Sequence, residues 1–509
     1  MSSLPRHHPT VVHMLQSAAV EAGDAEALVA GDVRLSYTEY RSCVARFAKE
    51  LQLLQVAGER VAILMGNSAD ICIALFATHA AGAVAVPLNP LYTERELRLV
   101  LADARPSVLI HDDAVASLAN GLGQELGILH IIATGPASRR LAVWSHEHVL
   151  LPEPLPAPDS LATLQYTGGT TGRSKGVRLT HAAIAINIAQ REALLPTRSN
   201  IERLLCVMPL FHVYAIAMCL HNMVACRGCL IVLPRFQPKE VLDLIRDERV
   251  TIFAGSPTLF TGLMNHEAFA NADFSSLHLS YSGSAALPEE LFRRWESASG
   301  APVVEGYGQS EAGPVVSFNP LDGMRKPGSV GIPLPGTDVQ IVDLTTGDHV
   351  LPAGERGEIR VRGPQVMSGY HELPEETAAA LRNGWLYTGD IGEFDADGYL
   401  YIRDRKKEMV KVSGFNVFPR EVEEVLYAHP AVLEAAVIGV PDPYKGETVC
   451  AFVVLRRGAT ADFDSLIDYC RKNLARYKVP GRIEIVEELP KTRVGKFDKV
   501  KLRENALPR

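Results

Sequence analysis

The chain has 509 residues, of which 47% are hydrophobic and 22% are charged, and its formal net charge is -8. This composition excludes a disordered chain, and the negative charge excludes a general attraction to nucleic acid or to an anionic membrane surface. Because this length exceeds what one hydrophobic core serves, we expect a large N-terminal region built of subdomains, followed by a smaller unit.

The N-terminal residues and the cysteines indicate a cytoplasmic protein. The first 16 residues lack the basic segment, apolar run and small-residue cleavage site of a secretory signal. The longest uncharged stretch, residues 71–92, is interrupted by glycine and prolines, so we expect no membrane span. Eight scattered cysteines suit reduced thiols, and the CxxC from Cys226 to Cys229 reads as core thiols because a second pair with zinc spacing is missing.

From Arg60 onward, strand-like and helix-like segments alternate in two runs. The first run predicts strands at residues 61–65, 84–88 and 107–113 and helices at residues 69–81 and 93–105. The second run, from Leu204 to Glu305, predicts strands at residues 206–210, 229–234, 251–255 and 277–283 and helices at residues 238–248 and 288–298. Such alternation is typical of a mainly parallel sheet covered by helices, so we predict two α/β subdomains.

After Gly306 the pattern changes to short strands separated by Gly, Pro and Asp, which predicts a small β-rich subdomain with strands at residues 339–343, 357–363 and 398–404. A charged run at residues 403–408 precedes a fresh pattern, with helices at residues 421–429 and 465–477 and strands at residues 433–440 and 449–455. We therefore predict an N-terminal domain (residues 1–403), a hinge (404–407) and a small, mobile α+β C-terminal domain (408–509). From charge alone, the run would be read as a solvated surface turn.

The strongest signal for phosphate binding is the segment YTGGTTGRSKG at residues 166–176. Its glycines let backbone N–H groups converge on an anion, its hydroxyls donate further hydrogen bonds, and its lysine adds positive charge. It is not a Walker A loop, because no Gly-Lys pair follows at the required spacing. It lies between a predicted strand at residues 161–165 and a predicted helix at residues 177–190, where binding loops occur in open α/β sheets. The candidate phosphate-binding residues are Thr167, Gly168, Gly169, Thr170, Thr171, Gly172 and Lys175.

A second block, EGYGQSE at residues 305–311, combines an aromatic ring with carboxylates. Tyr307 offers a flat apolar face to an adenine ring, and Glu311 offers a hard oxygen ligand suited to Mg2+ held against ATP phosphates. Standing alone, the block would be read as a buried aromatic residue at a strand end beside a solvated glutamate. Its candidate residues are Gly306, Tyr307, Gly308, Ser310 and Glu311.

Two further blocks follow toward the C-terminus. GWLYTGD ends in Asp390, whose carboxylate can accept hydrogen bonds from the vicinal hydroxyls of a ribose, and YLYIRDRKK contains Arg405. The basic segment LPKTRVGK covers residues 489–496. Alone, these blocks would be read as a turn and as a solvated basic tail.

In this order and spacing, the four blocks resemble the adenylate-forming superfamily of acyl-CoA ligases, peptide-synthetase adenylation domains and beetle luciferases. The amino-acid sequence in and around these blocks is most similar to that of bacterial fatty acyl-CoA ligases. Gly168 and Ser174 stand where Ser and Pro are commoner, and Ser310 stands where Thr is commoner, but a backbone or hydroxyl donor is retained each time. The resemblance implies that ATP and Mg2+ convert a carboxylic acid to an acyl adenylate, and that the acyl group then passes to coenzyme A.

The resemblance also implies roles for individual residues. Lys496 is the adenylation lysine, with Glu311 and Thr167 as the other catalytic residues. Asp390 and Arg405 hold the nucleotide. The remaining assignments are Gly283 and Ser284 in the nucleotide site, Lys407 as the hinge, Lys411, Ser413 and Gly414 in the CoA tunnel, and His212, Val213, Tyr214 and Tyr281 in the acyl pocket.

The pocket segments are apolar or small, add no arginine for a second carboxylate, and leave room at Gly306. We therefore expect a monocarboxylic, aliphatic acid of medium or long chain. Alternatives are an aryl or other carboxylate-CoA ligase, a free-standing adenylation enzyme that loads a carrier protein, and a luciferase-like oxygenase. A non-enzymatic acyl- or nucleotide-binding protein is the alternative from another class, and the retained Lys496, Glu311 and Asp390 argue against it. The expected partners are the acid, ATP and CoA, without nucleic acid, and a homodimer is left open.

Overall fold

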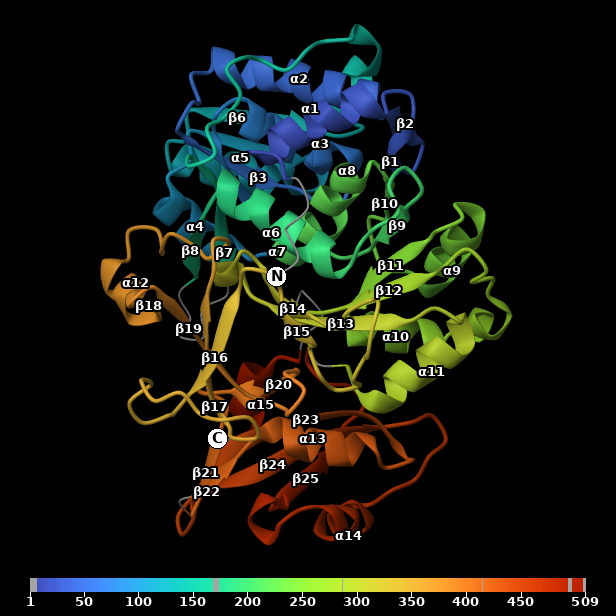
Figure 1. The fold of residues 1–509 in the computed structure, drawn as a ribbon, viewed down its shortest axis with the longest axis vertical. Coiled ribbons are helices and arrows are strands. Elements are labelled where there is room, and N and C mark those ends of the chain that lie inside the picture. The colour runs from blue at the N-terminus through green and yellow to red at the C-terminus, as the bar shows by residue number, and fades with distance from the viewer. Residues whose placement is uncertain (1–6, 168–173, 286, 414, 493–496, 507–509) are drawn as a thin grey trace.

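A computed structural model describes residues 7–167, 174–285, 287–413, 415–492 and 497–506. Four β-sheets organise the chain, three in the large N-terminal domain and one in the C-terminal domain, which lies at the red end of the ribbon in Figure 1. The mixed α/β architecture with two α/β subdomains, a β-rich subdomain and a smaller C-terminal domain confirms the predicted fold class.

The first sheet has six strands and is parallel except at one edge. In spatial order its strands are β6 (His130–Thr134), β5 (Val108–Asp112), β3 (Arg60–Leu64), β4 (Val84–Leu88), β7 (Leu161–Thr167) and β8 (Lys175–Thr180). The associated helices are α3 (Ala69–Ala80), α4 (Glu94–Ala104), α5 (Ala116–Glu125) and α6 (His181–Leu194). The central strands read as continuous apolar runs because both faces of a parallel sheet are buried.

The second sheet has nine strands, of which the six central ones run parallel. Its order is β15 (Ile332–Pro333), β14 (Val315–Phe318), β13 (Val303–Gly308), β12 (Leu279–Ser282), β11 (Ile252–Gly255), β9 (Arg203–Cys206), β10 (Cys229–Val232), β1 (Glu26–Ala30) and β2 (Val33–Ser36). Its helices are α1 (Val11–Glu21), α2 (Tyr37–Leu53), α7 (Val213–Ala215), α8 (Asn222–Cys226), α9 (Pro238–Asp247), α10 (Pro257–Met264) and α11 (Glu289–Ser299).

Helix α3 joins the two large sheets. All twelve of its residues are buried, and it contacts β3 and β4 of the first sheet and β1 of the second. A helix that is apolar on every side requires such enclosure. Its one acidic residue, Asp70, accepts a hydrogen bond from the backbone N–H of Leu141 at 2.9 Å, which satisfies part of the buried carboxyl group.

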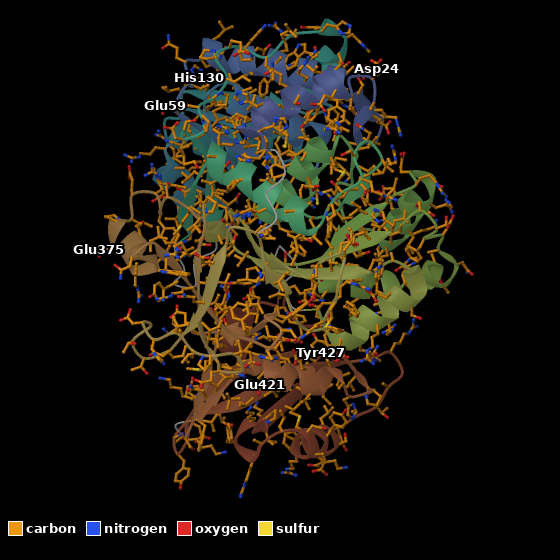
Figure 2. All side chains as sticks on the ribbon, viewed as in Figure 1. Asp24, Glu59, His130, Glu375, Glu421 and Tyr427 are labelled. Carbon is orange, nitrogen blue, oxygen red and sulfur yellow. The ribbon has the colours of Figure 1, made fainter. Side chains whose placement is uncertain are left out.

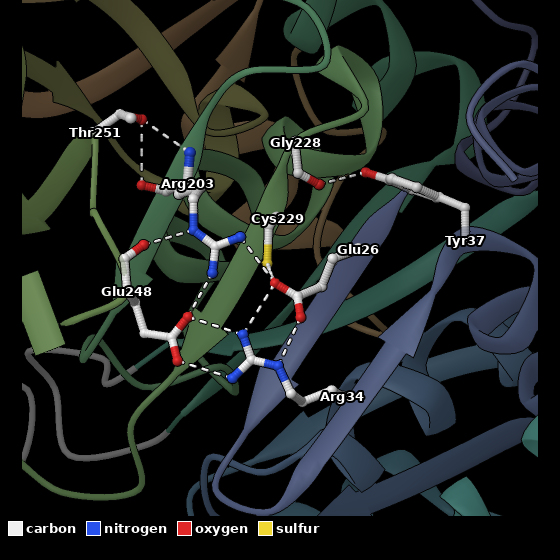
Figure 3. Close-up of polar contacts among 8 residues, drawn as sticks. All are labelled: Glu26, Arg34, Tyr37, Arg203, Gly228, Cys229, Glu248 and Thr251. Atoms are coloured by element: carbon white, nitrogen blue, oxygen red, sulfur yellow. Dashed lines mark hydrogen bonds and ion pairs between the residues drawn. The ribbon is translucent and has the colours of Figure 1, made fainter. Parts of the chain in front are cut away.

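A network of two arginines and two glutamates ties the N-terminal hairpin β1–β2 to the rest of the second sheet (Figure 3). Arg34 of β2 binds Glu26 of β1 at 2.7 Å and Glu248, which follows α9, at 2.8 Å. Arg203 of β9 also binds Glu26, at 2.8 Å. The thiol of Cys229 lies 3.5 Å from Glu26 within this network. Charges on segments about 200 residues apart therefore link the hairpin to the start of β9.

The third sheet is antiparallel and links the two domains. Its strands are β16 (Asp338–Val342), β17 (Gly357–Arg362), β18 (Leu381–Arg382), β19 (Trp385–Phe394) and β20 (Leu400–Arg405), with helix α12 (Pro374–Ala380) beside them. The C-terminal domain contains β21 (Val410–Val412), β22 (Phe415–Val417), β23 (Val432–Asp442), β24 (Gly446–Leu455) and β25 (Arg482–Ile485), and helices α13 (Pro419–Tyr427), α14 (Phe463–Asn473) and α15 (Lys499–Ala506).

Three sequence predictions need correction, and one pair of strands is additional. Residues 177–180, predicted as the start of a helix, belong to strand β8, and α6 begins only at His181 because Thr180 is its N-cap. The strand predicted at residues 206–210 ends at Cys206, before Pro209, which has no N–H to donate. The helix predicted at residues 465–477 ends at Asn473, because Leu474 is extended. Strands β1 and β2 were not predicted at all.

The cysteines and the helices bear on two further expectations. All eight cysteines are free thiols and buried, which confirms that the Cys226–Cys229 pair belongs to the core. Within the ranges that the structure describes, no helix is both long and apolar enough to cross a membrane.

Candidate active site

The stem of the predicted phosphate loop is an antiparallel pair of strands. The strands β7 and β8 end opposite one another, with Thr167 paired to Lys175. Between these two residues, Gly168, Gly169, Thr170, Thr171 and Gly172 lie outside the described residues. The ammonium of Lys175 lies 5.0 Å above the centre of the Tyr370 ring, and an aromatic face attracts such a cation. The hairpin thus presents a hydroxyl and a positive charge at one point.

Glu311 lies in a short 3-10 helix, Ser310–Ala312, that follows the end of β13. The hydroxyl of Tyr370 donates a hydrogen bond of 3.0 Å to its Oε1 atom. Burial raises the pKa of the Glu311 carboxyl group, while the hydrogen bond from Tyr370 opposes that rise. A desolvated carboxylate held in one orientation is suited to bind a metal cation. Gly308 is required nearby, because a Cβ atom there would lie 2.1 Å from the carbonyl oxygen of Pro314.

Asp390 lies in the middle of β19 and is only 4% exposed. Tyr307 Oη donates to its Oδ2 atom at 2.6 Å, and Arg405 Nε lies 3.2 Å from its Oδ1 atom. The pairing of Asp390 with Arg405 across β19 and β20 places these two side chains together. A carboxylate has about four acceptor positions, so two ribose hydroxyls can still bind. The sequence predicts a role for the Tyr307 ring, whereas the hydrogen bond from its hydroxyl depends on β13 and β19 lying close together.

The segment predicted to line the acyl pocket begins at His212. Its Nδ1 atom accepts a hydrogen bond of 3.3 Å from the backbone N–H of Tyr214 and so caps the short helix α7, which includes Val213. A π-helix, Ile216–His221, follows at once, and such turns often occur at functional sites. The Tyr214 ring packs on Gly283, where a Cβ atom would lie 2.8 Å from Tyr214 Cε2.

The structure adds two observations about this pocket. The room expected at Gly306 is filled by the ring of Phe318, which would lie 2.5 Å from an added Cβ atom. Tyr281 is fully buried, and Arg191 Nη1 donates to its hydroxyl at 3.2 Å. The Tyr281 hydroxyl therefore already has a protein partner. Neither effect is visible in the sequence, because Phe318 and Arg191 come from other strands and helices.

Three buried polar atoms from three of the predicted segments have no hydrogen-bond partner among the residues that the structure describes. They are Tyr214 Oη, Ser284 Oγ and Gln309 Nε2. Ser284 also has a positive φ of 70°, which is uncommon for a residue with a side chain. Leaving a buried polar atom unpaired costs about 1 to 3 kcal/mol. Such atoms fit a site that a polar ligand completes.

The C-terminal residues of the predicted site lie in two places. Lys407 lies between β20 and β21, and its pKa is lowered mainly by desolvation and to a smaller extent by repulsion from Arg405. Lys411 and Ser413 lie on the β21–β22 hairpin, which Figure 1 shows at the end of the C-terminal domain remote from the N-terminal domain. They are therefore not brought together with Glu311 and Asp390. Gly414 and Lys496 lie outside the described residues.

The residues on either side of 493–496 are anchored near the domain junction. Lys491 forms an ion pair with Glu434 at 2.6 Å, and Lys499 forms one with Glu423 at 2.8 Å. Arg503 of α15 binds Glu408 at 3.0 Å, just after the predicted hinge. The C-terminal segment thus lies on the side of its domain that faces the hinge.

Two residues at the site were missed by sequence reasoning. Tyr370 binds both Glu311 and Lys175 although it is 59 residues from Glu311. Glu358 binds Lys406 at 2.8 Å and accepts a hydrogen bond from the N–H of Gly389. The only signal for Tyr370 was a Gly-Tyr pair in a loop, and the backbone contact that carries it to β8, between the N–H of Arg178 and Gly369 O, is long-range.

Glu305 at the start of the second block is a buried carboxyl group that is 3% exposed. Its Oε1 atom accepts a hydrogen bond of 3.0 Å from the N–H of Leu287, and burial raises its pKa to about 7 from 4.5. Because the folded-state pKa is raised, the protonated group contributes stability that is complete below pH 4.5 and lost as the pH rises through 7.

Replacing Glu305 by glutamine is therefore expected to stabilise the protein more at pH 8 than at pH 5. The gain at pH 8 should be at most about 3 kcal/mol, because each unit of pKa shift corresponds to 1.36 kcal/mol. Urea unfolding of the wild type and the variant at both pH values measures the difference. A difference that stays constant over this range would contradict the assignment of a raised pKa to Glu305.

Comparisons with known proteins agree along the whole chain. The family model described as AMP-binding enzyme matches residues 15–371, and the AMP-binding enzyme C-terminal domain matches residues 421–496. The long-chain-fatty-acid–CoA ligase of Bacillus subtilis (strain 168) is 39% identical over 98% of this chain and 95% of that protein. The feruloyl-CoA synthase of an Amycolatopsis species is 40% identical over 94% of this chain and 95% of that protein.

One solved protein is similar in two states. ATP-bound MatB from Rhodopseudomonas palustris matches with a TM-score of 0.91 at 33% identity, and the match covers 98% of each chain. Apo MatB matches with a TM-score of 0.81 at the same identity and coverage. The whole chain is therefore closer in shape to the ATP-bound state than to the apo state.

Proposed function

The chain belongs to the AMP-binding enzyme family, and on that premise we propose that it activates a medium- or long-chain fatty acid. It is an ATP-dependent acyl-CoA ligase, whose substrates are a carboxylic acid, ATP and coenzyme A. The carboxylate and ATP give acyl-AMP and pyrophosphate, and CoA then takes the acyl group and releases AMP. The observation that carries the choice of acid is the full-length similarity to long-chain-fatty-acid–CoA ligases.

The described residues support a division of labour in the first half-reaction. A carboxylate is a poor acylating agent because its leaving group would be oxide, and a mixed anhydride with AMP removes that obstacle. Thr167, Lys175 and the loop between them would bind the ATP phosphates. Tyr307 would face the adenine, and Asp390, fixed by Tyr307 and Arg405, would accept hydrogen bonds from the ribose.

The residues at Glu311 fit a magnesium ion. Mg2+ is commonly bound by one or two carboxylates together with substrate phosphates, and Glu311 offers one buried carboxylate oriented by Tyr370. When bound, the ion supplies positive charge that offsets the charge of the phosphates. The hydrogen bond from Tyr370 would keep the Glu311 carboxylate in place while an oxygen of the acid attacks the α-phosphorus and pyrophosphate leaves.

The second half-reaction would use another face of the C-terminal domain. We propose residues 1–403 as the N-terminal domain, 404–407 as the hinge and 408–509 as the C-terminal domain. Rotation about Lys407 would withdraw Lys496 and bring Lys411, Ser413 and Gly414 to the site as part of the CoA tunnel. The present position of the β21–β22 hairpin, at the end of the C-terminal domain remote from the N-terminal domain, and the greater similarity to ATP-bound MatB support an adenylate-forming arrangement here.

An aromatic acid is the second candidate substrate. The 40% identity to a feruloyl-CoA synthase favours it, and the buried, unpartnered Tyr214 Oη would suit a substrate with a polar substituent. His212, Val213 and Tyr214 would line the acyl pocket in either case. The free thiols of all eight cysteines support a cytoplasmic location, which we infer as well.

Acid-dependent AMP release, measured with and without CoA, tests the proposed function. A panel of fatty, aromatic and dicarboxylic acids should give the highest kcat/KM with a fatty acid, and release should require CoA. Rapid AMP release without CoA would instead indicate an enzyme that stops at the adenylate or loads a carrier protein. A higher kcat/KM for aromatic acids would replace the fatty acid by the second candidate.

A further inference from the structure

Five charges of alternating sign cross the junction between the two domains. Arg403 and Arg356 both bind Glu393 of β19, and Arg356 and Lys478 both bind Glu421 of α13. Arg403, Glu393 and Arg356 belong to the N-terminal domain, whereas Glu421 and Lys478 belong to the C-terminal domain. Figure 2 labels Glu421 and Tyr427 on α13, at the level where the domains meet.

Arg356 is the member of this chain of charges that binds both domains. Its Nε atom lies 2.8 Å from Glu393 Oε2, and its Nη1 atom lies 2.6 Å from Glu421 Oε1. Its guanidinium also lies 5.4 Å from the centre of the Phe418 ring, at the start of α13. A planar guanidinium can make such contacts in several directions at once, which an ammonium group could not do equally well.

The partial burial of these side chains makes the contact more than a surface ion pair. The exposed fractions are 33% for Arg356, 15% for Glu393 and 17% for Glu421. Solvent and salt therefore screen the pair less than they screen a fully exposed one. The contact joins α13 of the C-terminal domain to β19 of the N-terminal domain.

The arrangement can open without leaving an unpaired charge. If Arg356 separates from Glu421, Arg356 keeps Glu393, and Glu421 keeps Lys478. A cavity of about 370 Å³ adjoins the pair, lined by residues that include Arg356, Arg403, Glu421 and Glu424. It would let water reach the separating groups. Opening thus avoids the large penalty of stranding a buried charge.

A second ion pair crosses the junction at another point. Arg456, which follows β24, binds Glu290 of α11 at 3.0 Å. Glu290 also has Arg294 of its own helix 3.9 Å away, so it too keeps a partner when the domains part. Among the described residues, ion pairs thus cross the junction at both of these points, and polar contacts of this kind permit relative domain motion.

From these contacts we infer that Arg356 is a positioning residue that holds the C-terminal domain in the adenylate-forming arrangement by reversible pairing with Glu421. This inference rests on the proposed two-step function. The strength of the pair sets how the enzyme divides its time between the two half-reactions, because the pair exists only while the domains are docked as they are here.

Arg356→Gln should favour the second half-reaction at the expense of the first. Acid-dependent exchange of pyrophosphate into ATP should fall about threefold to fivefold, whereas thioester formation from supplied acyl adenylate and CoA should be unchanged or faster. Glu421→Gln should act in the same direction, and the double variant should be no worse than either single variant. Hydrogen exchange of α13 without substrates should become faster in each variant.

Arg98→Gln is the matched control. Arg98 also bridges two carboxylates, Glu94 at 2.6 Å and Glu125 at 2.8 Å, and is 37% exposed, but all three lie in the N-terminal domain. Arg98→Gln should change neither the ratio of the half-reaction rates nor the rate of hydrogen exchange in α13. An unchanged ratio in Arg356→Gln would overturn the inference. If the wild type shows no half-reaction with any acid, the proposed function fails, and exchange of α13 alone then tests the contact.

Discussion

Glu311→Gln is expected to lower acid-dependent pyrophosphate exchange about 100- to 1000-fold, because loss of one preorganised electrostatic contact at a reacting group costs that much. The amide keeps the shape of the side chain and can still accept the hydrogen bond from Tyr370. It removes the charge that would bind the metal next to the phosphates. The remaining activity should require more Mg2+ than the wild type does.

The same substitution should not weaken the fold. Burial raises the pKa of Glu311, so the charged form is already disfavoured in the folded protein, and the neutral amide relieves that cost. The melting temperature should therefore be equal to or above that of the wild type. Glu375→Gln, on the exposed surface of α12, is the control and should leave exchange unchanged. If the rate of pyrophosphate exchange in Glu311→Gln were within threefold of the wild-type rate, the metal-binding role of Glu311 would be contradicted.

Lys496→Ala is expected to reduce adenylation about 1000-fold while sparing thioester formation from supplied acyl adenylate. A positive charge about 4 Å from developing negative charge contributes roughly 4 kcal/mol at an effective dielectric constant of 20, before desolvation is subtracted. The role of Lys496 comes from the family resemblance. The anchored residues on either side of it support a position near the hinge.

Lys501 offers the matched control, since it is an exposed lysine on α15, five residues further along the chain. Lys501→Ala should leave both half-reactions unchanged. If Lys496→Ala lowered both half-reactions by the same factor, the assignment of separate domain arrangements to the two steps would be wrong.

The regular elements of the large sheets could be predicted from the sequence, because buried parallel strands and their helices carry distinct apolar patterns. Strand β4 and helix α3 agree with prediction within one residue at each end. Strand β8 could not be predicted, since it is a short edge strand continuous with α6. Strand β1 was missed although it forms a local hairpin with β2, and its other neighbour, β10, lies about 200 residues away in the sequence.

The candidate site also contains some residues that could be predicted from the sequence and others that could not. Residues that stand together in one block, such as Tyr307 and Glu311, could be proposed as candidates because spacing and residue type carry the signal. Tyr370 and Arg356 could not, since each acts through contacts with residues far away in the sequence. The variants Glu311→Gln and Lys496→Ala test the roles predicted for these two residues.

The pairing of β1 with β10 also has a consequence for synthesis on the ribosome. Leu28 lies beside Leu230 in the finished sheet, so the N-terminal hairpin must wait until about 200 more residues have been made. At 5 to 20 residues per second, that delay is roughly 10 to 40 s. During this time the apolar strand β1 has an unpaired edge, which makes the nascent chain a candidate for chaperone binding.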